Sequence, residues 1–275
     1  MFRKIYIILR DFSRQSAEQN TSAFAASTAF FLFLSLVPML ILICTLLPFT
    51  PLTEENLVNA LTEFIPDVMD GLATNIISDV YDKSAGILSI AAFATLWSAG
   101  KGLLALMRGL NAVNHVVEER NYFVVRALAS FYTIVMLLVV LLSLFIMVFG
   151  NILLEMLLVQ VPSVKGLYSF LMNFRFLVVW FILTILFAAV YAYVPNEKLR
   201  FGDQITGASF AAVAWSVFSW GFSIYVESSG AFSTYGSLSI IIIAMLWLYF
   251  GMYIIMMGAQ VNQYFRPARK NPEVS

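Results

Sequence analysis

The chain has 275 residues, of which 61% are hydrophobic and only 12% are charged, whereas roughly 25% of the residues in a soluble domain are charged. Sixteen lysines and arginines balance sixteen aspartates and glutamates, so there is no overall basic field to attract nucleic acid. The single cysteine, Cys44, excludes a disulfide within the chain. This composition argues against a soluble domain and against a nucleic-acid-binding protein. It predicts one integral membrane domain, residues 1–275.

The first predicted element is a basic amphipathic segment, residues 1–22. Its basic residues lie between apolar residues that recur at helical spacing, namely Phe2, Ile5, Tyr6, Leu9 and Phe12. We expect no cleavable signal here, because a short apolar core with a small-residue cleavage site is missing. The pattern predicts a cytoplasmic helix that either lies on an anionic membrane face or packs as a lid over the membrane helices.

Six long apolar runs follow, each near or above the ~20 residues that a helix needs to cross the hydrocarbon core. They cover residues 23–47, 86–107, 127–150, 176–194, 205–226 and 237–261. A segment in lipid must satisfy its own backbone polar groups, so runs of this length predict α-helices. The predicted fold class is therefore all-α, a polytopic membrane protein with six transmembrane helices.

The orientation follows from the lysines and arginines outside the runs. Twelve of them lie before the first run, between the second and third, between the fourth and fifth, or after the sixth. Only three lie in the other connections, namely Lys83, Lys165 and Arg175. Because basic residues are retained on the inner side of a membrane, this bias predicts that both termini are cytoplasmic.

The first external connection, residues 48–85, carries seven acids and one lysine. Its apolar residues predict two amphipathic helices separated by Pro66. Such an acidic loop can concentrate cations at a mouth, or it can simply be the wet face of a lid.

Small residues predict where the helices meet, because they let two backbones approach closely in lipid. In the run 205–226, two series of small residues at four-residue spacing begin at Gly207 and at Ala208. The run 86–107 contains Ala94, Ser98 and Gly102 at the same spacing. We expect these two runs at the centre of the bundle. Near the cytoplasmic end of the last run, Gln260 and Asn262 are predicted to hydrogen-bond across helices.

Lys101 is the sharpest polar signal, because a charge within a span is costly and usually functional. Arg108 lies seven residues later, which is roughly 10 Å along a helix, and Asn111 follows it. Lys101 can pair with Asp203 or Glu197, can snorkel to the interface, or can serve an anionic group such as a lipid phosphate. On the other side of the membrane, Glu155, Glu227 and Tyr235 are candidates for an external polar vestibule. We therefore take seven residues as candidate ligand- or lipid-binding residues: Lys101, Arg108, Asn111, Asp203, Glu155, Glu227 and Tyr235.

The residue types and spacings in the sequence give little support for catalysis or metal binding. The only histidine, His115, has Glu118 and Glu119 nearby, whereas a metal site usually needs several ligands at defined spacing. No nucleophile–histidine pair and no phosphate-binding glycine loop can be proposed. We predict no catalytic residue, no metal, no cofactor and no enzymatic activity.

An ordered set of short elements resembles the YihY/BrkB family of bacterial inner-membrane proteins. The elements are Ser35-Leu36-Val37-Pro38, Leu96-Trp97-Ser98-Ala99, Met107-Arg108-Gly109-Leu110-Asn111, Glu119-Arg120, Tyr193-Val194-Pro195-Asn196, Gly207-Ala208, Ser223-Ile224-Tyr225, Tyr235-Gly236-Ser237-Leu238, Leu246-Trp247-Leu248-Tyr249 and Gly258-Ala259. The resemblance covers about residues 20–265, and it departs at Gln260, where many relatives have glutamate.

The resemblance implies six transmembrane helices in a bacterial plasma membrane, but no mechanism. Some members of the family carry a ribonuclease BN label, and others are associated with serum resistance and lipid movement. The sequence favours transport or flipping of an amphipathic or anionic envelope molecule such as a lipid. Its predicted partners are membrane lipids and a lipid or envelope-precursor substrate, without nucleic acid, and no oligomeric state is predicted. The alternative is a non-transporting scaffold for envelope assembly. A membrane ribonuclease is disfavoured, because the chain has neither a cluster of metal ligands nor a basic groove.

Overall fold

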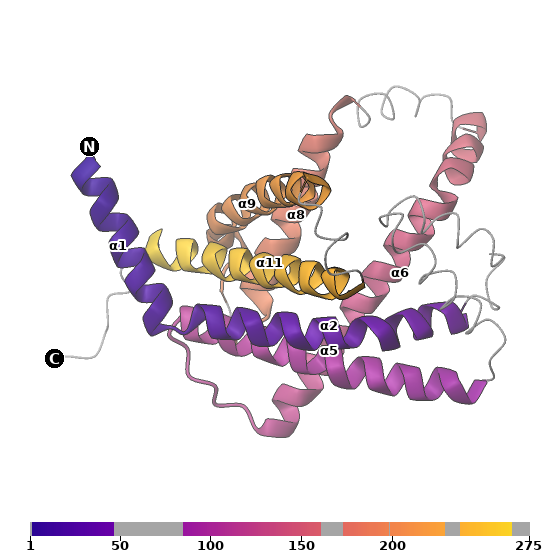
Figure 1. Cartoon of the computed structure of the whole chain (residues 1–275), viewed down its shortest axis with the longest axis horizontal. Helices are drawn as coiled ribbons and strands as arrows, with labels where there is room; N and C mark the ends of the chain where they lie inside the picture. Colours follow the sequence, from indigo (N-terminus) through magenta and orange to yellow (C-terminus); the bar gives the residue numbers. More distant parts are fainter. Residues whose placement is uncertain (1, 47–84, 161–172, 198, 229–236, 266–275) are drawn as a thin grey trace. The chain divides into compact units, whose positions relative to one another are not determined.

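The computed structural model describes residues 2–46, 85–160, 173–197, 199–228 and 237–265, and these residues form helices and their connections without a β-strand. The helices are α1 (Phe2–Glu18), α2 (Thr21–Leu46), α5 (Ala85–Val113), α6 (Tyr122–Gln160), α8 (Arg175–Tyr193), α9 (Phe201–Ser228) and α11 (Ser237–Phe265) (Figure 1). The predicted all-α fold class is confirmed. The acidic connection 48–85 lies almost entirely outside the described residues.

Five of the described helices contain stretches long and apolar enough to cross a membrane. The stretches are Thr21–Met39, Tyr122–Val139, Phe176–Tyr193, Phe201–Ser228 and Leu238–Phe265. The protein is therefore a multi-pass membrane protein. The remaining predicted run, 86–107, is helical within α5, but the side chains of its first residues are described only in part. The sixth span and the cytoplasmic placement of both termini stay predictions.

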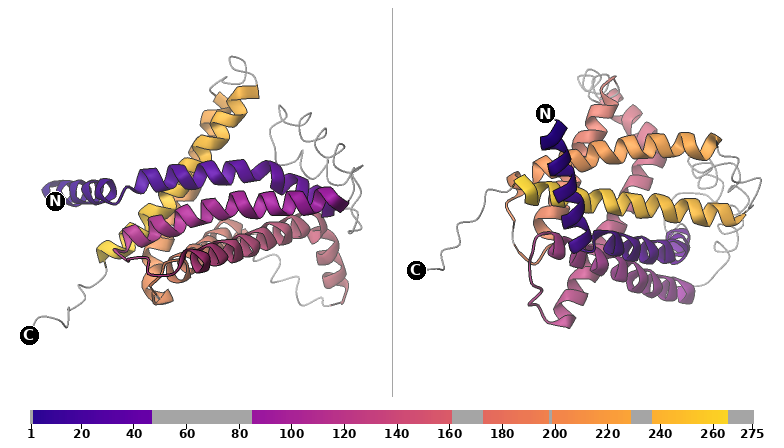
Figure 2. Two further views of the ribbon diagram at one scale, coloured as in Figure 1. Left: turned by 90° about the horizontal axis from the view of Figure 1, so that it is seen from below. Right: turned by 60° about the vertical axis from the view of Figure 1, so that its left-hand side comes forward.

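The chain divides into two compact units. The first unit comprises residues 1–30, 102–125 and 174–275, and the second comprises residues 31–101 and 126–173. In the first unit, α9 packs against both α8 and α11, and α1 touches α11. Figure 2 shows α9 and α11 running side by side and α1 beside the C-terminal end of α11.

The crossing of α9 and α11 is built on two glycines. A Cβ atom on Gly207 would overlap the carbonyl oxygen of Gly258, and one on Gly258 would lie only 2.7 Å from the carbonyl oxygen of Gly207 and 2.8 Å from the Cβ of Ala211. Ala208, Ala211 and Ala212 are completely buried beside them. The predicted small-residue contact is thus confirmed for the first half of α9, whereas Ser223, further along the same ladder, is exposed. Whether α5 joins α9 at the centre stays a prediction.

Buried polar side chains reinforce this crossing. The Oδ1 of Asn262 accepts a hydrogen bond from the N–H of Gly207 at 2.6 Å, and its Nδ2 donates to the carbonyl oxygen of Gln204 at 3.1 Å and to the Oε1 of Gln204 at 3.0 Å. The hydroxyl of Tyr191 on α8 donates to the carbonyl oxygen of Ile255 on α11 at 2.6 Å. The prediction that Asn262 bonds across helices is confirmed, and its partner helix is α9.

The second half of α1 packs against α11. The Nε2 of Gln260 donates to the carbonyl oxygen of Phe12 at 3.0 Å, and the hydroxyls of Ser16 and Tyr253 lie 3.4 Å apart. The predicted cross-helix role of Gln260 is therefore confirmed as well. These contacts place residues 12–16 against α11, while the side chains of residues 2–9 are outside the described set. Whether the segment 1–22 lies on the membrane face or packs as a lid stays a prediction.

Candidate functional site

The only histidine of the chain, His115, lies in the cap that follows the C-terminal end of α5. The N–H of Val116 bonds to the carbonyl oxygen of Asn111 at 2.9 Å, and that of His115 bonds to the carbonyl oxygen of Ala112 at 3.2 Å. His115 itself has φ 55°. This pair of bonds around a left-handed residue is a Schellman cap, which closes the last turn of a helix. The side chain is exposed, with its Nε2 3.5 Å from the Nε2 of Gln19, and no group of three or more metal-ligating side chains is found among the described residues.

This geometry predicts the effect of replacing His115. Glycine adopts positive φ without the steric cost that a Cβ atom imposes. His115→Gly is therefore expected to raise the free energy of unfolding by about 0.5–1 kcal/mol, while His115→Ala leaves that strain in place. Unfolding of both variants in the same detergent measures the difference, and a glycine variant less stable than the alanine variant would contradict the assignment.

A polar network joins the connection after α5 to the connection after α8. The carboxylate of Glu118 makes a two-pronged ion pair with the guanidinium of Arg120, with both N–O distances at 2.7 Å. Asn111 is buried; its Nδ2 donates to Glu118 at 2.8 Å, and its Oδ1 accepts from the N–H of Asn196 at 2.8 Å. The side chain of Asn196 in turn donates to the carbonyl oxygen of Val117 at 3.1 Å. In this arrangement Asn111 uses both ends of its amide to hold two connections together.

The Glu118–Arg120 pair makes a prediction about pH. Hydrogen bonding from the guanidinium lowers the pKa of Glu118 below its ordinary value of 4.5. A carboxyl whose folded pKa is depressed contributes stability above its unfolded pKa, and that contribution is lost as the pH falls through the folded pKa. As the pH falls from neutral to below the ordinary value of 4.5, wild-type protein should thus lose more stability than Glu118→Gln. Thermal unfolding over this range is the measurement, and parallel curves for the two proteins would refute the prediction.

In the second unit, two cations contact one indole ring. Trp97 and Lys101 are one turn apart on α5, and the Nζ of Lys101 lies 5.6 Å from the centroid of the Trp97 ring and 5.3 Å from that of Phe31. The guanidinium carbon of Arg126 on α6 lies 4.6 Å from the Trp97 ring centroid, and its Nη2 donates to the carbonyl oxygen of Trp97 at 3.2 Å. These are cation–π distances. We call Lys101, Trp97 and Arg126 the cation cluster.

Positive charge in the cation cluster is not balanced by the described part of its unit. The residues 31–46, 85–101, 126–160 and 173 contain a single carboxylate, Glu155. Glu155 lies 29 residues beyond Arg126 on the same continuous helix α6, which is about 44 Å along the axis. The predicted partners Asp203 and Glu197 belong to the first unit, so their pairing with Lys101 stays a prediction.

The other predicted site residues are distributed over both units. Arg108 is exposed on the part of α5 that belongs to the first unit, and Asp203 is exposed in the first turn of α9. Glu227 accepts a hydrogen bond from the hydroxyl of Ser223 at 3.0 Å. Glu155 lies on α6 with its side chain outside the described set, and Tyr235 lies outside the described residues altogether. Their roles in binding stay predictions.

Sequence reasoning missed Arg126 as a site residue, because it was counted as a basic residue of the connection before α6. The spacing of Trp97 and Lys101 was the available signal, since residues four apart share one face of a helix. Which cation reaches Trp97 from another helix depends on tertiary packing.

Comparison with known proteins settles the family. Residues 12–274 match the family model described as Virulence factor BrkB. The chain belongs to the BrkB family. Two of the elements that carried the resemblance, Met107–Asn111 and Tyr193–Asn196, meet at the hydrogen bond between Asn111 and Asn196.

Relatives in the BrkB family differ in name and in length. A protein of Bacillus subtilis (strain 168) named Putative ribonuclease-like protein YfkH is 32% identical over 264 residues, which cover 95% of this chain and 96% of that protein. A UPF0761 membrane protein of Coxiella burnetii (strain Dugway 5J108-111) is 26% identical over 95% of this chain and 94% of its own. A UPF0761 membrane protein of Alkalilimnicola ehrlichii is 24% identical to this chain, and the matched region covers 57% of the length of that protein. No solved structure matches the chain significantly.

Proposed function

We propose that this BrkB-family protein transports or flips an amphipathic, anionic envelope molecule such as an anionic lipid. The observation that carries the proposal is the cation cluster, in which Lys101 and Arg126 share the ring of Trp97 without a carboxylate in reach within the described part of their unit. Charges on membrane helices are costly to hold and are retained mainly for function. A phosphate-bearing headgroup would supply a negative charge that the described part of the unit does not place beside the two cations.

The two cations suit different parts of such a headgroup. Arg126 presents a planar, weakly hydrated guanidinium that can bind a phosphate through two parallel hydrogen bonds, whereas Lys101 offers a point charge on a flexible stem. Trp97 is 49% exposed, so the cluster is not sealed inside the second unit. A lipid headgroup therefore has access to it, and we propose binding there as the first step of movement.

Movement of labelled phosphatidylglycerol in vesicles tests the proposal. Purified wild-type protein is expected to bring the fluorescent lipid from the protected to the accessible leaflet faster than protein-free vesicles do, and faster than it moves labelled phosphatidylcholine. The double variant Lys101→Gln, Arg126→Gln should lose this activity. Arg200→Gln is the matched control, because Arg200 is an exposed cation of the first unit. Wild-type protein that moves neither lipid would overturn the proposal.

We also propose that the protein is not a nuclease, although one relative carries a ribonuclease-like name. The support is the structural use of His115, whose backbone caps α5 and whose ring nitrogen lies beside Gln19. Purified protein incubated with RNA and Mg²⁺, Mn²⁺ or Zn²⁺ should leave the RNA intact. Metal-dependent cleavage that disappears in His115→Ala would refute this.

A further inference from the structure

The cation cluster offers more hydrogen-bond donors than the contacts within it use. The guanidinium of Arg126 carries five N–H donors, and its Nη2 uses one of them on the carbonyl oxygen of Trp97 at 3.2 Å. Whichever hydrogen of Nη2 makes that bond, one side of the planar fork keeps two parallel donors for a ligand. The ammonium of Lys101 carries three further donors and lies over the rings of Trp97 and Phe31, which attract its charge but leave N–H groups for other acceptors.

Both charges can reach a single phosphate group. The Nζ of Lys101 lies 5.6 Å and the guanidinium carbon of Arg126 lies 4.6 Å from the same ring centroid, so the two charges are at most the sum of these distances, about 10 Å, apart. A phosphate that accepts charge-assisted hydrogen bonds of about 2.8 Å on two sides bridges such a gap, with the flexible stem of Lys101 taking up the difference. Both cationic side chains are only half-buried, so a ligand can approach them from outside.

A phosphomonoester matches this set of donors better than a phosphodiester does. A phosphodiester has two non-bridging oxygens and one negative charge, so the paired donors of Arg126 use both oxygens. A phosphomonoester has three terminal oxygens, and its charge approaches −2 above a second pKa of about 6. The third oxygen provides an acceptor for Lys101, and the second charge balances the second cation.

We propose that the cation cluster is selective for a phosphomonoester, with Arg126 binding two of its terminal oxygens and Lys101 binding the third. This inference rests on the proposed function, because it names the class of anion that is bound at the same site. Two sources carry this group: a phosphatidate headgroup in the membrane, and a water-soluble compound such as glycerol 3-phosphate. The same recognition applies to both.

Competition for bound phosphatidate tests the selectivity. Purified protein in detergent micelles is equilibrated with radiolabelled dioleoyl phosphatidate, and unlabelled dioleoyl phosphatidate or dioleoyl phosphatidylglycerol displaces the label in a scintillation proximity assay. At about pH 7.5, wild-type protein is expected to bind phosphatidate about tenfold more tightly than phosphatidylglycerol. This ratio is the lower end of what an additional charge-assisted hydrogen bond contributes, because both cations are partly exposed to solvent that screens them.

The preference should change with pH in one direction. Two adjacent cations lower the pKa of the bound phosphate below that of the free one, so phosphatidate binds more tightly as the pH rises to the free pKa of about 6 and no more tightly above it. Phosphatidylglycerol has no ionisation in this range and provides the reference. Glu155, the single carboxylate in the described part of this unit, lies about 44 Å further along α6, so its titration does not alter the result.

Four variants assign the preference to the two cations. Lys101→Gln removes the partner of the third oxygen, so the two lipids should bind with similar affinity, whereas Lys101→Arg keeps the charge and should retain most of the preference. Arg126→Gln should weaken both lipids. Arg200→Gln is the matched control, because it removes one exposed cation of the first unit and should keep the wild-type preference. A loss caused only by the reduced net charge of the protein would appear in this control as well.

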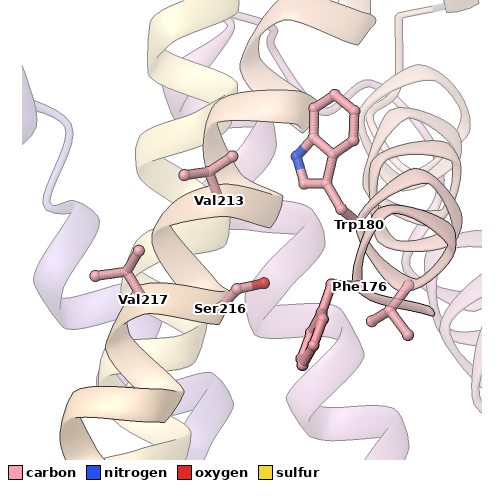
Figure 3. Close-up of a pocket in the computed structure, with 6 residues that line it drawn as sticks. Phe176, Trp180, Val213, Ser216 and Val217 are labelled. Atoms are coloured by element: carbon pink, nitrogen blue, oxygen red, sulfur yellow. The ribbon is translucent and has the colours of Figure 1, made fainter. Parts of the chain in front are cut away.

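The groove between α8 and α9 provides a second control (Figure 3). It has a volume of about 400 Å³ and is lined by Phe176, Val179, Trp180, Val213, Ser216 and Val217. None of these side chains is charged, and a phosphate placed among them would be desolvated without a cationic partner. Val213→Trp narrows the groove and should leave both affinities unchanged, which separates phosphate recognition from general uptake of lipid by apolar surfaces.

Glycerol 3-phosphate identifies the source of the phosphate. If it displaces labelled phosphatidate at concentrations similar to those of the unlabelled lipid, the site binds a soluble phosphomonoester; if it needs far higher concentrations, the site binds a lipid. Equal affinities of wild type for the two lipids, or a preference that survives in Lys101→Gln, would overturn this inference. Either result would leave the proposed function untouched, since that function requires only that an anionic lipid is bound and moved. Binding of neither lipid would overturn both.

Discussion

Replacing Gly258 by alanine is expected to lower the free energy of unfolding by about 3 kcal/mol or more. The added Cβ would meet the hydroxyl of Tyr191, the carbonyl oxygen of Gly207 and the Cβ of Ala211 at once. Two of these atoms belong to α9, and the third belongs to a completely buried residue of α8, so none can move aside cheaply. Overpacking of this kind typically costs 1–3 kcal/mol, and displacing the Tyr191 hydroxyl also breaks its hydrogen bond to Ile255, worth about 1 kcal/mol.

Gly221 on α9 provides the control for this experiment. It is exposed, and no atom lies within 4 Å of the position that its Cβ would occupy. Gly221→Ala should therefore raise stability by up to about 1 kcal/mol, because alanine is the better helix former. Thermal unfolding of the two variants in one detergent compares them directly. If both substitutions shift the midpoint in the same direction, the close crossing of α9 and α11 is not what limits the size of residue 258.

The lengths of the helices show what hydropathy can and cannot predict. The predicted run 176–194 and the helix Arg175–Tyr193 nearly coincide, because apolar residues fill that helix from end to end. The run 86–107 falls short of Val113, where α5 ends. That helix continues through Arg108 and Asn111 until the left-handed His115 closes it. A helix cap depends on backbone conformation and hydrogen bonds, and the hydropathy of a run carries no information about either.

Contacts between helices were predictable where one residue type dictates them. Small residues at four-residue spacing indicated the Gly207 side of the crossing, and isolated amides in an apolar run indicated Asn262 and Gln260. The partner of Gly207 is Gly258, which no spacing within α9 could have identified. The same limit applies to the cation cluster, since Lys101 was evident from its cost in a membrane but Arg126 reaches Trp97 only through the packing of α6 beside α5.

Removing the ring of Trp97 is expected to weaken the binding of phosphatidylglycerol about tenfold or more. A cation–π contact contributes about 0.5–2 kcal/mol, and Trp97 makes two of them, with Lys101 and with Arg126. Trp97→Ala would leave both charges in the protein but would release them from the geometry that brings them together. Binding measured at low and at physiological salt should show the loss at both, because screening acts on the charges rather than on the ring.

A double-mutant cycle distinguishes this positioning role from simple loss of packing. Because Trp97 acts through the two cations, Trp97→Ala should have little further effect in protein that already carries Lys101→Gln and Arg126→Gln, and the combined loss should fall well short of the sum of the separate losses. Trp97→Phe is the conservative variant; it keeps a weaker ring for the cations and should recover part of the binding. Strict additivity in the cycle would mean that the ring and the cations act independently, and the cation cluster would then not be the phosphate-binding unit of this protein.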